Sequence, residues 1–548
     1  GVPVKIATPL SIGPSLFRSM GQVVARYRPG RQGSRCESDQ SNASDCDEDI
    51  GHRDFRPPDV PNAITVLTWN VAAVNNNPFE YWITHPSPEY RRLMEAVEAF
   101  VLTPGSEDAR VDEVFRPEML ERVMARMEAA GMQELDRVRT AWRADYGSRR
   151  IVSEFLRDGS IGKKRLVSMP DRVTNTIQLA SGGAAYRPAV SNCYPESIGS
   201  MEDWFEKWME YVFDTEVDLD GKGGKKVYTL LQPIKRSKYP AVTELEEAMS
   251  LPLQIVLLGV FDAILVNLML AKAGGFWQDL RGEICASLNS RKNPRVLEIL
   301  RSTYADADMV FLQEAGNQLV DLLRPSYAET HDLVLPKSYS HKRGQNSIML
   351  LRRGLVADVR EVEVPADGWD SGDLLAVSAT VAGAQVTLAS FHGDTNGLLT
   401  APALSRVLEH APAGGLVFGM DANTYERESS STYHVLDFER KFTSLGLKAC
   451  WPTVQAARYT TFNARTYLQP QLNKAAKSTE LAEKGDRNPK DFVLFSGGFE
   501  AVGTWRDNTG RLEFVEDMVF PTLDFPSDHA VLSTELRFKL RRPSQQEL

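Results

Sequence analysis

A succession of short apolar stretches after Ala305 constrains the fold more than any other feature of this sequence. The clearest stretches span 309–316, 347–354, 373–393, 414–423, 491–498 and 529–538. Their length and their β-branched and aromatic residues predict strands, and Gly383 predicts a hairpin turn inside the third stretch. Only two helical connections, near 398–411 and 432–446, separate them. This pattern predicts an α/β fold of two packed, mostly antiparallel mixed sheets flanked by helices.

One more strand is expected far upstream, over Ile64–Val71. From about Tyr81 to Ser302 the apolar residues take helical spacing, with Gly and Pro between the segments. The clearest helices are expected at 94–101, 118–132, 149–159, 201–213 and 243–274. We therefore expect a large all-helical insertion, 81–302, between the two parts of one domain, 61–80 and 303–540.

The segment Leu251–Leu270 is long enough to span a bilayer, but polar residues interrupt it. An aspartate in the middle of a span, here Asp262, costs several kcal/mol in lipid. We expect a buried core helix and no membrane contact.

The net charge and the cysteines limit the kinds of substrate, metal ion and compartment that suit this protein. The 548 residues carry a net charge of -10, whereas a protein that coats nucleic acid without specificity is usually basic. A phosphate-bearing substrate would therefore have to meet a local site or a metal ion. The five cysteines are scattered and form no C-x-x-C, which argues against a disulfide framework or a zinc site and suits a reducing compartment.

The first 36 residues are basic and contain no acid, and residues 37–49 are acidic with no base. This composition predicts a flexible N-terminal arm over 1–60. We expect an intracellular protein, cytoplasmic in the first place. An organelle is the alternative, because a basic, acid-free start resembles a targeting segment.

Polar residues stand at the ends of several expected strands, where a core strand would stay apolar. They are Asn70, Glu314, His392, Asp421, Asn423, Asp491, Asp528 and His529. Strand ends of packed sheets converge on one rim, so these side chains could surround one point. Carboxylates with few histidines and no cysteine suit Mg²⁺ or Mn²⁺ better than zinc.

Six short motifs, TWN, LQE, SFH, GMDAN, KDFVLF and PSDH, occur in this order. Together they resemble the endonuclease/exonuclease/phosphatase superfamily. The resemblance implies a four-layer α/β sandwich that cleaves phosphoester bonds with Mg²⁺ or Mn²⁺, formed by 61–80 and 303–540. Two departures stand out: the helical block separates the Asn70 and Glu314 motifs, and no carboxylate follows Asn70.

Carried over residue by residue, the resemblance makes Glu314 the main metal ligand, with Asn70 and Asp528 beside it. Such an ion would neutralise charge on the phosphate oxygens during attack.

The same resemblance implies catalytic roles for five residues. Asp421 would polarise the attacking water, and Asn423 would hold that water or a phosphate oxygen. His529 would contact the scissile phosphate, with Asp491 orienting it and raising its pKa, and His392 would bind the phosphate as well.

Substrate binding is assigned to Asn396, in the polar loop 392–397, and to Tyr425; a simple tight turn is the alternative for that loop. The expected function is a phosphodiesterase for a nucleic acid or nucleotide, with a possible protein partner at the helical insertion. The alternatives are a phosphoinositide or sphingolipid phosphoesterase and a catalytically silent scaffold.

Overall fold

The computed structural model describes residues 63–339, 344–411, 414–454, 458–470, 472, 475 and 485–538. The expected N-terminal arm lies outside these residues. All described residues belong to one compact unit, so the expected division into domains stays a prediction.

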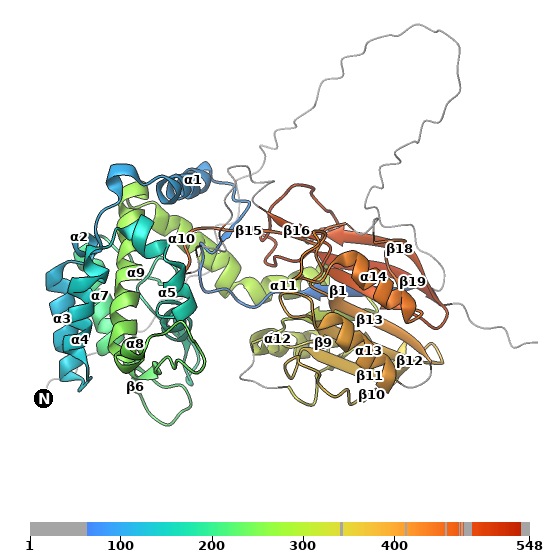
Figure 1. Ribbon diagram of the computed structural model, residues 1–548. Helices are drawn as coiled ribbons and strands as arrows, with labels where there is room; N and C mark the ends of the chain where they lie inside the picture. The colour runs from blue at the N-terminus through green and yellow to red at the C-terminus, as the bar shows by residue number, and fades with distance from the viewer. Residues whose placement is uncertain are drawn as a thin grey trace, which may run out of the picture. The chain divides into compact units, whose positions relative to one another are not determined.

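Two six-stranded sheets form the framework (Figure 1). The first has the order β18-β19-β1-β7-β9-β8. Its strands are β1 (Ala63–Asn70), β7 (Met309–Gln313), β8 (His331–Val334), β9 (Ile348–Arg352), β18 (Phe499–Asp507) and β19 (Val531–Phe538). Only the pair β1 and β7 is parallel.

The second sheet has the order β10-β11-β12-β13-β17-β14. Its strands are β10 (Val356–Glu361), β11 (Leu374–Val381), β12 (Ala384–His392), β13 (Gly415–Asp421), β14 (Lys448–Ala449) and β17 (Asp491–Phe495). Only β12 and β13 run parallel. Two mostly antiparallel mixed sheets are therefore confirmed.

Successive side chains of a strand point to opposite faces of its sheet, so each sheet contacts one core on each face. In β7, Met309 and Phe311 belong to the core between the sheets, whereas Val310 and Leu312 belong to a second core on the outer face. Helices α11 (Lys292–Ser302) and α12 (Asn317–Tyr327) contribute to that outer core. Helices α13 (Thr400–His410) and α14 (Val435–Ser444) cover the other sheet. The four layers are helix, sheet, sheet and helix.

The region between β1 and β7 is mostly helical, as expected. Its α-helices before α11 are α1 (Pro88–Leu102), α2 (Val111–Val114), α3 (Pro117–Ala129), α4 (Leu135–Ala144), α5 (Gly159–Lys164), α6 (Ser168–Thr174), α7 (Met201–Phe213), α8 (Glu244–Ala248), α9 (Ser250–Ala273) and α10 (Trp277–Cys285). Two small ladders interrupt them, formed by β3 (Thr176–Gln178) with β4 (Ala184–Tyr186) and by β5 (Glu216–Val217) with β6 (Lys225–Lys226). A third small sheet pairs β2 (Tyr81–Trp82) with β15 (Thr461–Arg465), which also pairs with β16 (Asp486–Asn488). The sequence analysis missed these short ladders because their strands lack long apolar runs.

Helix α9 is the core of the helical region. By length and composition alone it could cross a membrane, but 89% of its most apolar window is buried inside the protein. Asp262, in its middle, accepts hydrogen bonds from Arg187 Nε at 2.9 Å and Trp208 Nε1 at 3.0 Å. A buried, fully paired aspartate is what a core helix requires, so the expected core helix is confirmed.

One disulfide corrects the cysteine analysis. Cys193 and Cys285 are bonded across 92 residues of sequence, and Cys450 is free and buried. The expectation of no disulfide was wrong for this pair. Its residues carry no local spacing motif, and only the folding of the helical region brings them together.

Candidate active site

The register of the two sheets brings the polar strand ends together. In the first sheet Asn70 lies beside Gln313, the residue before Glu314. In the second sheet Asp421 pairs with His392 on one side and with Asp491 on the other. Because both parallel pairs end at the same rim, motifs hundreds of residues apart become neighbours.

Two of these residues, which follow the ends of β7 and β13, have a left-handed backbone conformation. Glu314 has φ 55° and Asn423 has φ 48°, a region that costs a residue with a Cβ about 1–2 kcal/mol. Such strain persists where the surroundings impose it, often at functional sites. Here the backbone turns directly after β7 and β13, which directs the Glu314 carboxylate back toward Asn70.

Asn70 links the two sheets. Its Nδ2 donates to Glu314 Oε1 at 3.2 Å and to Asp421 Oδ2 at 3.0 Å. Its Oδ1 accepts from Ala72 N at 2.8 Å. Both sets of contacts require the same amide orientation, in which Asn70 positions the carboxylates. Direct ligation of a metal by Asn70 stays a prediction.

Glu314 and His392 form a half-buried ion pair, with 17% and 19% of their side chains exposed. His392 Nε2 lies 3.2 Å from Glu314 Oε1 and 3.8 Å from Asp421 Oδ2. Burial opposes the charge on His392, but the two carboxylates outweigh it and raise its pKa to about 9. Burial opposes the charge on Glu314 too, yet His392, Ala73 N and Asn70 hold its pKa far below the ordinary value.

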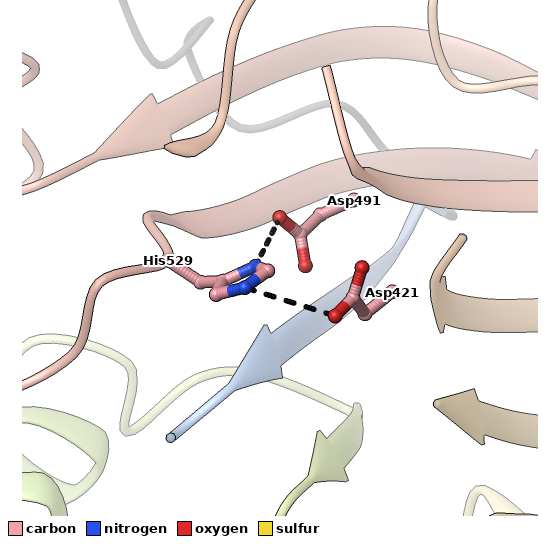
Figure 2. A group of neighbouring side chains, drawn as sticks. All are labelled: Asp421, Asp491 and His529. Atoms are coloured by element: carbon pink, nitrogen blue, oxygen red, sulfur yellow. Dashed lines mark hydrogen bonds and ion pairs between the residues drawn. The ribbon is translucent and has the colours of Figure 1, made fainter. Parts of the chain in front are cut away.

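His529 is held between two aspartates (Figure 2). Its Nδ1 lies 2.9 Å from Asp491 Oδ2 and its Nε2 lies 3.7 Å from Asp421 Oδ2. Burial opposes the charge on the imidazole, but Asp491 and Asp421 raise its pKa to about 10. Thr460 Oγ1 donates to the same Asp491 oxygen at 2.6 Å. The ring is therefore oriented by Nδ1 and is charged at neutral pH.

Two groups of residues have the chemistry to hold a metal ion. Asp421, Asp491 and His529 offer ligand atoms within 4.8 Å of one another, so this buried group could hold an ion. His529 Nδ1 and Thr460 Oγ1 already occupy Asp491 Oδ2. Asp491 Oδ1 is buried and has no hydrogen-bond partner among the described residues, so an ion would have to bind that oxygen. We interpret this group as the one that handles protons.

Glu314 and Asp528 are the second group, and both line the same cavity. Asp528 Oδ2 accepts a long hydrogen bond from Asn463 Nδ2, 3.4 Å, which leaves most of its acceptor capacity open. Two carboxylates beside a cavity that admits water fit the oxygen ligands of Mg²⁺ or Mn²⁺.

That cavity has a volume of about 370 Å³. Segment 72–81 and Arg465 line it together with Ile284, Leu288 and Lys292 from the helical region. The Lys292 side chain is buried, and burial lowers its pKa to about 8 although Asp528 and Glu314 oppose the shift.

The predicted catalytic and metal-binding residues thus gather in one network or line the adjoining cavity. The two predicted substrate contacts lie beside it. Tyr425 Oη donates to Thr395 O at 2.7 Å, and the Asn396 carbonyl accepts from Tyr433 N at 2.8 Å. Neither residue lines the cavity, so their role stays a prediction.

Three residues of the site escaped the sequence analysis. Gln345 Nε2 donates to Glu314 Oε2 at 3.1 Å, Thr460 supports Asp491, and Lys292 faces the cavity. None of them sits in a motif or closes a predicted strand, so no sequence signal marked them.

Comparison with known proteins gives two kinds of match. A family model described as "Domain of unknown function (DUF8234)" matches residues 108–282, inside the helical region. No match was found among the curated proteins compared.

Several solved structures match about half of the chain. A humanized TDP2 from D. rerio is 15% identical to this protein. The match covers 46% of this chain and 94% of the TDP2 chain, with a TM-score of 0.32. An endonuclease/exonuclease/phosphatase from Bacteroides vulgatus is 13% identical, with coverages of 46% and 94% and a TM-score of 0.32. Another, from Beutenbergia cavernae, is 18% identical, with coverages of 45% and 66% and a TM-score of 0.30. The last two bear the name of the superfamily that the six motifs resemble. At these identities and TM-scores the likeness does not bear on the activity of this chain.

Proposed function

We propose that this protein is a Mg²⁺- or Mn²⁺-dependent phosphoesterase that hydrolyses a phosphodiester in a nucleic acid or nucleotide. One observation carries the proposal. Two histidines with raised pKa values, the buried His529 and the half-buried His392, share Asp421. Two further carboxylates, Glu314 and Asp528, open onto the adjoining cavity. Phosphodiester hydrolysis needs cationic donors, an activated water and a cation site in this proximity.

Each residue has a role that follows from its contacts. Asp421 would accept a proton from the attacking water, because it is buried and lies opposite the Nε2 atoms of both histidines. His529, protonated and oriented by Asp491, would donate to a phosphate oxygen or to the leaving group. His392 would add a second positive donor to the phosphate. Asn70 and Asn423 would keep Glu314 and Asp421 in place through their amide N–H groups.

A divalent ion bound by Glu314 and Asp528 would supply charge neutralisation at the phosphate. Both side chains present oxygen, the ligand atom that Mg²⁺ and Mn²⁺ prefer.

Hydrolysis of bis-p-nitrophenyl phosphate tests the proposal. The wild-type protein should release p-nitrophenol with Mg²⁺ or Mn²⁺, and Glu314→Ala should lower kcat by at least 100-fold, as removal of a group that stabilises the transition state does. Glu298→Ala, at an exposed position of α11, is the matched control and should keep full activity.

Equal inactivity of the wild type and Glu314→Ala with both ions would instead favour the silent scaffold. A panel of single-stranded RNA, single-stranded DNA, phosphoinositides and sphingomyelin then separates the substrate classes. A membrane-facing 251–270 segment would have favoured the lipid alternative, but that segment belongs to the buried helix α9.

A further inference from the structure

Lys292 is a buried cation from the helical region that lines the cavity beside the candidate active site. It is the first residue of α11, and only 2% of it is exposed. Its Nζ donates to the carbonyl of Val71, the residue after Asn70. An ammonium has three N–H donors. Among the described residues, Val71 O is the acceptor that Nζ contacts.

A buried ammonium with donors left over is costly unless something compensates it. Glu314 and Asp528 favour its charged form, yet among the described residues no carboxylate oxygen forms an ion pair with Nζ within 4.0 Å. Lys292 lines the same cavity as these two carboxylates. Its spare donors therefore have room for an anionic oxygen that enters the cavity.

The walls of the cavity come from two distant parts of the chain. Asn289 Nδ2, one turn before Lys292, donates to Asn75 O at 3.1 Å and Asn76 Oδ1 at 2.9 Å, which ties the helical region to the rim. Ile284 and Leu288 add apolar surface on the same side. A volume of about 370 Å³ lies at the lower end of the range for small-molecule pockets, so it suits one nucleoside-sized group and not a duplex.

The other cation of the cavity is already neutralised. Arg465 forms an ion pair with Glu80 and donates to Tyr81 Oη at 2.9 Å. Lys292 is thus the cation of this cavity that is best placed to bind a phosphate oxygen.

We propose that this cavity binds a nucleoside monophosphate group, with the Lys292 ammonium bonded to a phosphate oxygen and the nucleoside against Ile284 and Leu288. The inference deepens the proposed function and rests on it for the choice of a nucleotide. Lys292 would then be a substrate-binding residue that comes from the helical region.

Calorimetric binding of adenosine 5′-monophosphate to the full chain with Mg²⁺ tests the proposal, and adenosine is the probe without phosphate. Lys292→Met should weaken the monophosphate about 10- to 100-fold, the loss expected for a hydrogen bond to a charged group, and should leave adenosine unaffected. Lys292→Arg should recover part of the affinity. Lys225→Met, at an exposed position of β6, should bind as the wild type does.

Leu288→Trp is a second variant, which changes the apolar wall of the same cavity. It should weaken both probes by filling the space, and it decides the matter if Lys292→Met does not fold. A merely structural Lys292 would lower the melting temperature in Lys292→Met and leave the affinity of the monophosphate unchanged.

Three outcomes would overturn the inference: a wild type that binds no monophosphate, a Lys292→Met protein that folds and binds like the control, or unchanged binding in Leu288→Trp. Failure of the proposed function looks different. In that case bis-p-nitrophenyl phosphate is not hydrolysed, while monophosphate binding still depends on Lys292.

Discussion

At the scale of single residues, the site is governed by charges that are buried in pairs. Asp491 and His529 are both almost inaccessible and lie 2.9 Å apart, so each depends on the other for its charge. Because Asp491, with Asp421, raises the pKa of His529 from 6.5 to about 10, these interactions stabilise the fold fully below about pH 6.5. This stabilisation is lost as the pH rises through 10.

Asp491→Asn should lower the pKa of His529, because the nearest carboxylate is lost while burial remains. Asp421 and, more weakly, Asp528 would then support the charge. NMR titration of the His529 ring in metal-free protein measures the shift directly. Thr460→Val is the control, since it removes the hydrogen bond that the Thr460 hydroxyl donates to Asp491 and those that it accepts from Lys490 N and Asp491 N, and leaves the charge of Asp491 in place. An unchanged pKa of His529 in Asp491→Asn would contradict the assigned role.

The second prediction concerns the backbone strain at Asn423. Its φ of 48° suits glycine better than alanine, and both replacements lose the same hydrogen bond from Nδ2 to Gly393 O. Asn423→Ala should therefore be less stable than Asn423→Gly by about 1 kcal/mol. Urea unfolding of the two variants measures the difference. An alanine variant as stable as the glycine variant would show that the left-handed turn is not imposed.

At the scale of elements, the short helix α8 shows how a local cap and a distant cation combine. Glu246 accepts from Thr243 N at 2.8 Å in a capping box and from Lys164 Nζ at 2.7 Å. Burial opposes its charge, but Lys164 and Thr243 outweigh burial and lower its pKa. A lowered carboxyl pKa means stability that is present above pH 4.5 and lost as the pH falls through the pKa in the folded protein.

Glu246→Gln should accordingly unfold more easily at pH 7, by about 1 kcal/mol, and the difference should shrink toward pH 3. Chemical denaturation at the two pH values tests this. Glu244→Gln, whose side chain is 91% exposed, is the control and should change little at either pH. A deficit that is independent of pH would mean that the carboxylate charge contributes nothing.

At the scale of the whole molecule, one hydrophobic core runs through the helical region and under the first sheet. It contains Trp208 and Leu257 from the helices together with Leu67 and Leu312 from β1 and β7. The core between the sheets is separate. A continuous core predicts that the helices and the sandwich unfold together.

Arg187→Met tests this cooperativity. It leaves Asp262 buried without its partner, which should cost about 3–5 kcal/mol. Scanning calorimetry should show one transition, shifted as a whole to lower temperature. Asp262→Leu in the same chain should restore part of the loss, because no fully buried unpaired charge then remains and Asp171, which also loses Arg187, keeps 20% of its side chain in contact with solvent. Two transitions, of which only one moves, would show that the helical region is an independent domain.

Much of this architecture could be predicted because it is written in local patterns. Alternating and helical spacing indicated the sheets and the helices, since each spacing turns one face toward a core. Polar residues at strand ends, such as Glu314 and Asp421, stood out against that pattern and were correctly expected to converge. The six motifs and their order implied the roles that we propose for those residues.

The sequence by itself thus determined most of the long strands and helices and the polar groups at their ends. It did not reveal β8, β10, β18 and α12, which lie outside the predicted stretches. The tertiary structure alone decided the Cys193–Cys285 bond, the support of Asp491 by Thr460 and the arrival of Lys292 beside Asp528. The physical reason is that periodicity is a local signal: it indicates only which face of a helix or strand a residue occupies. The meeting of segments that are far apart in sequence depends on how whole helices and sheets pack.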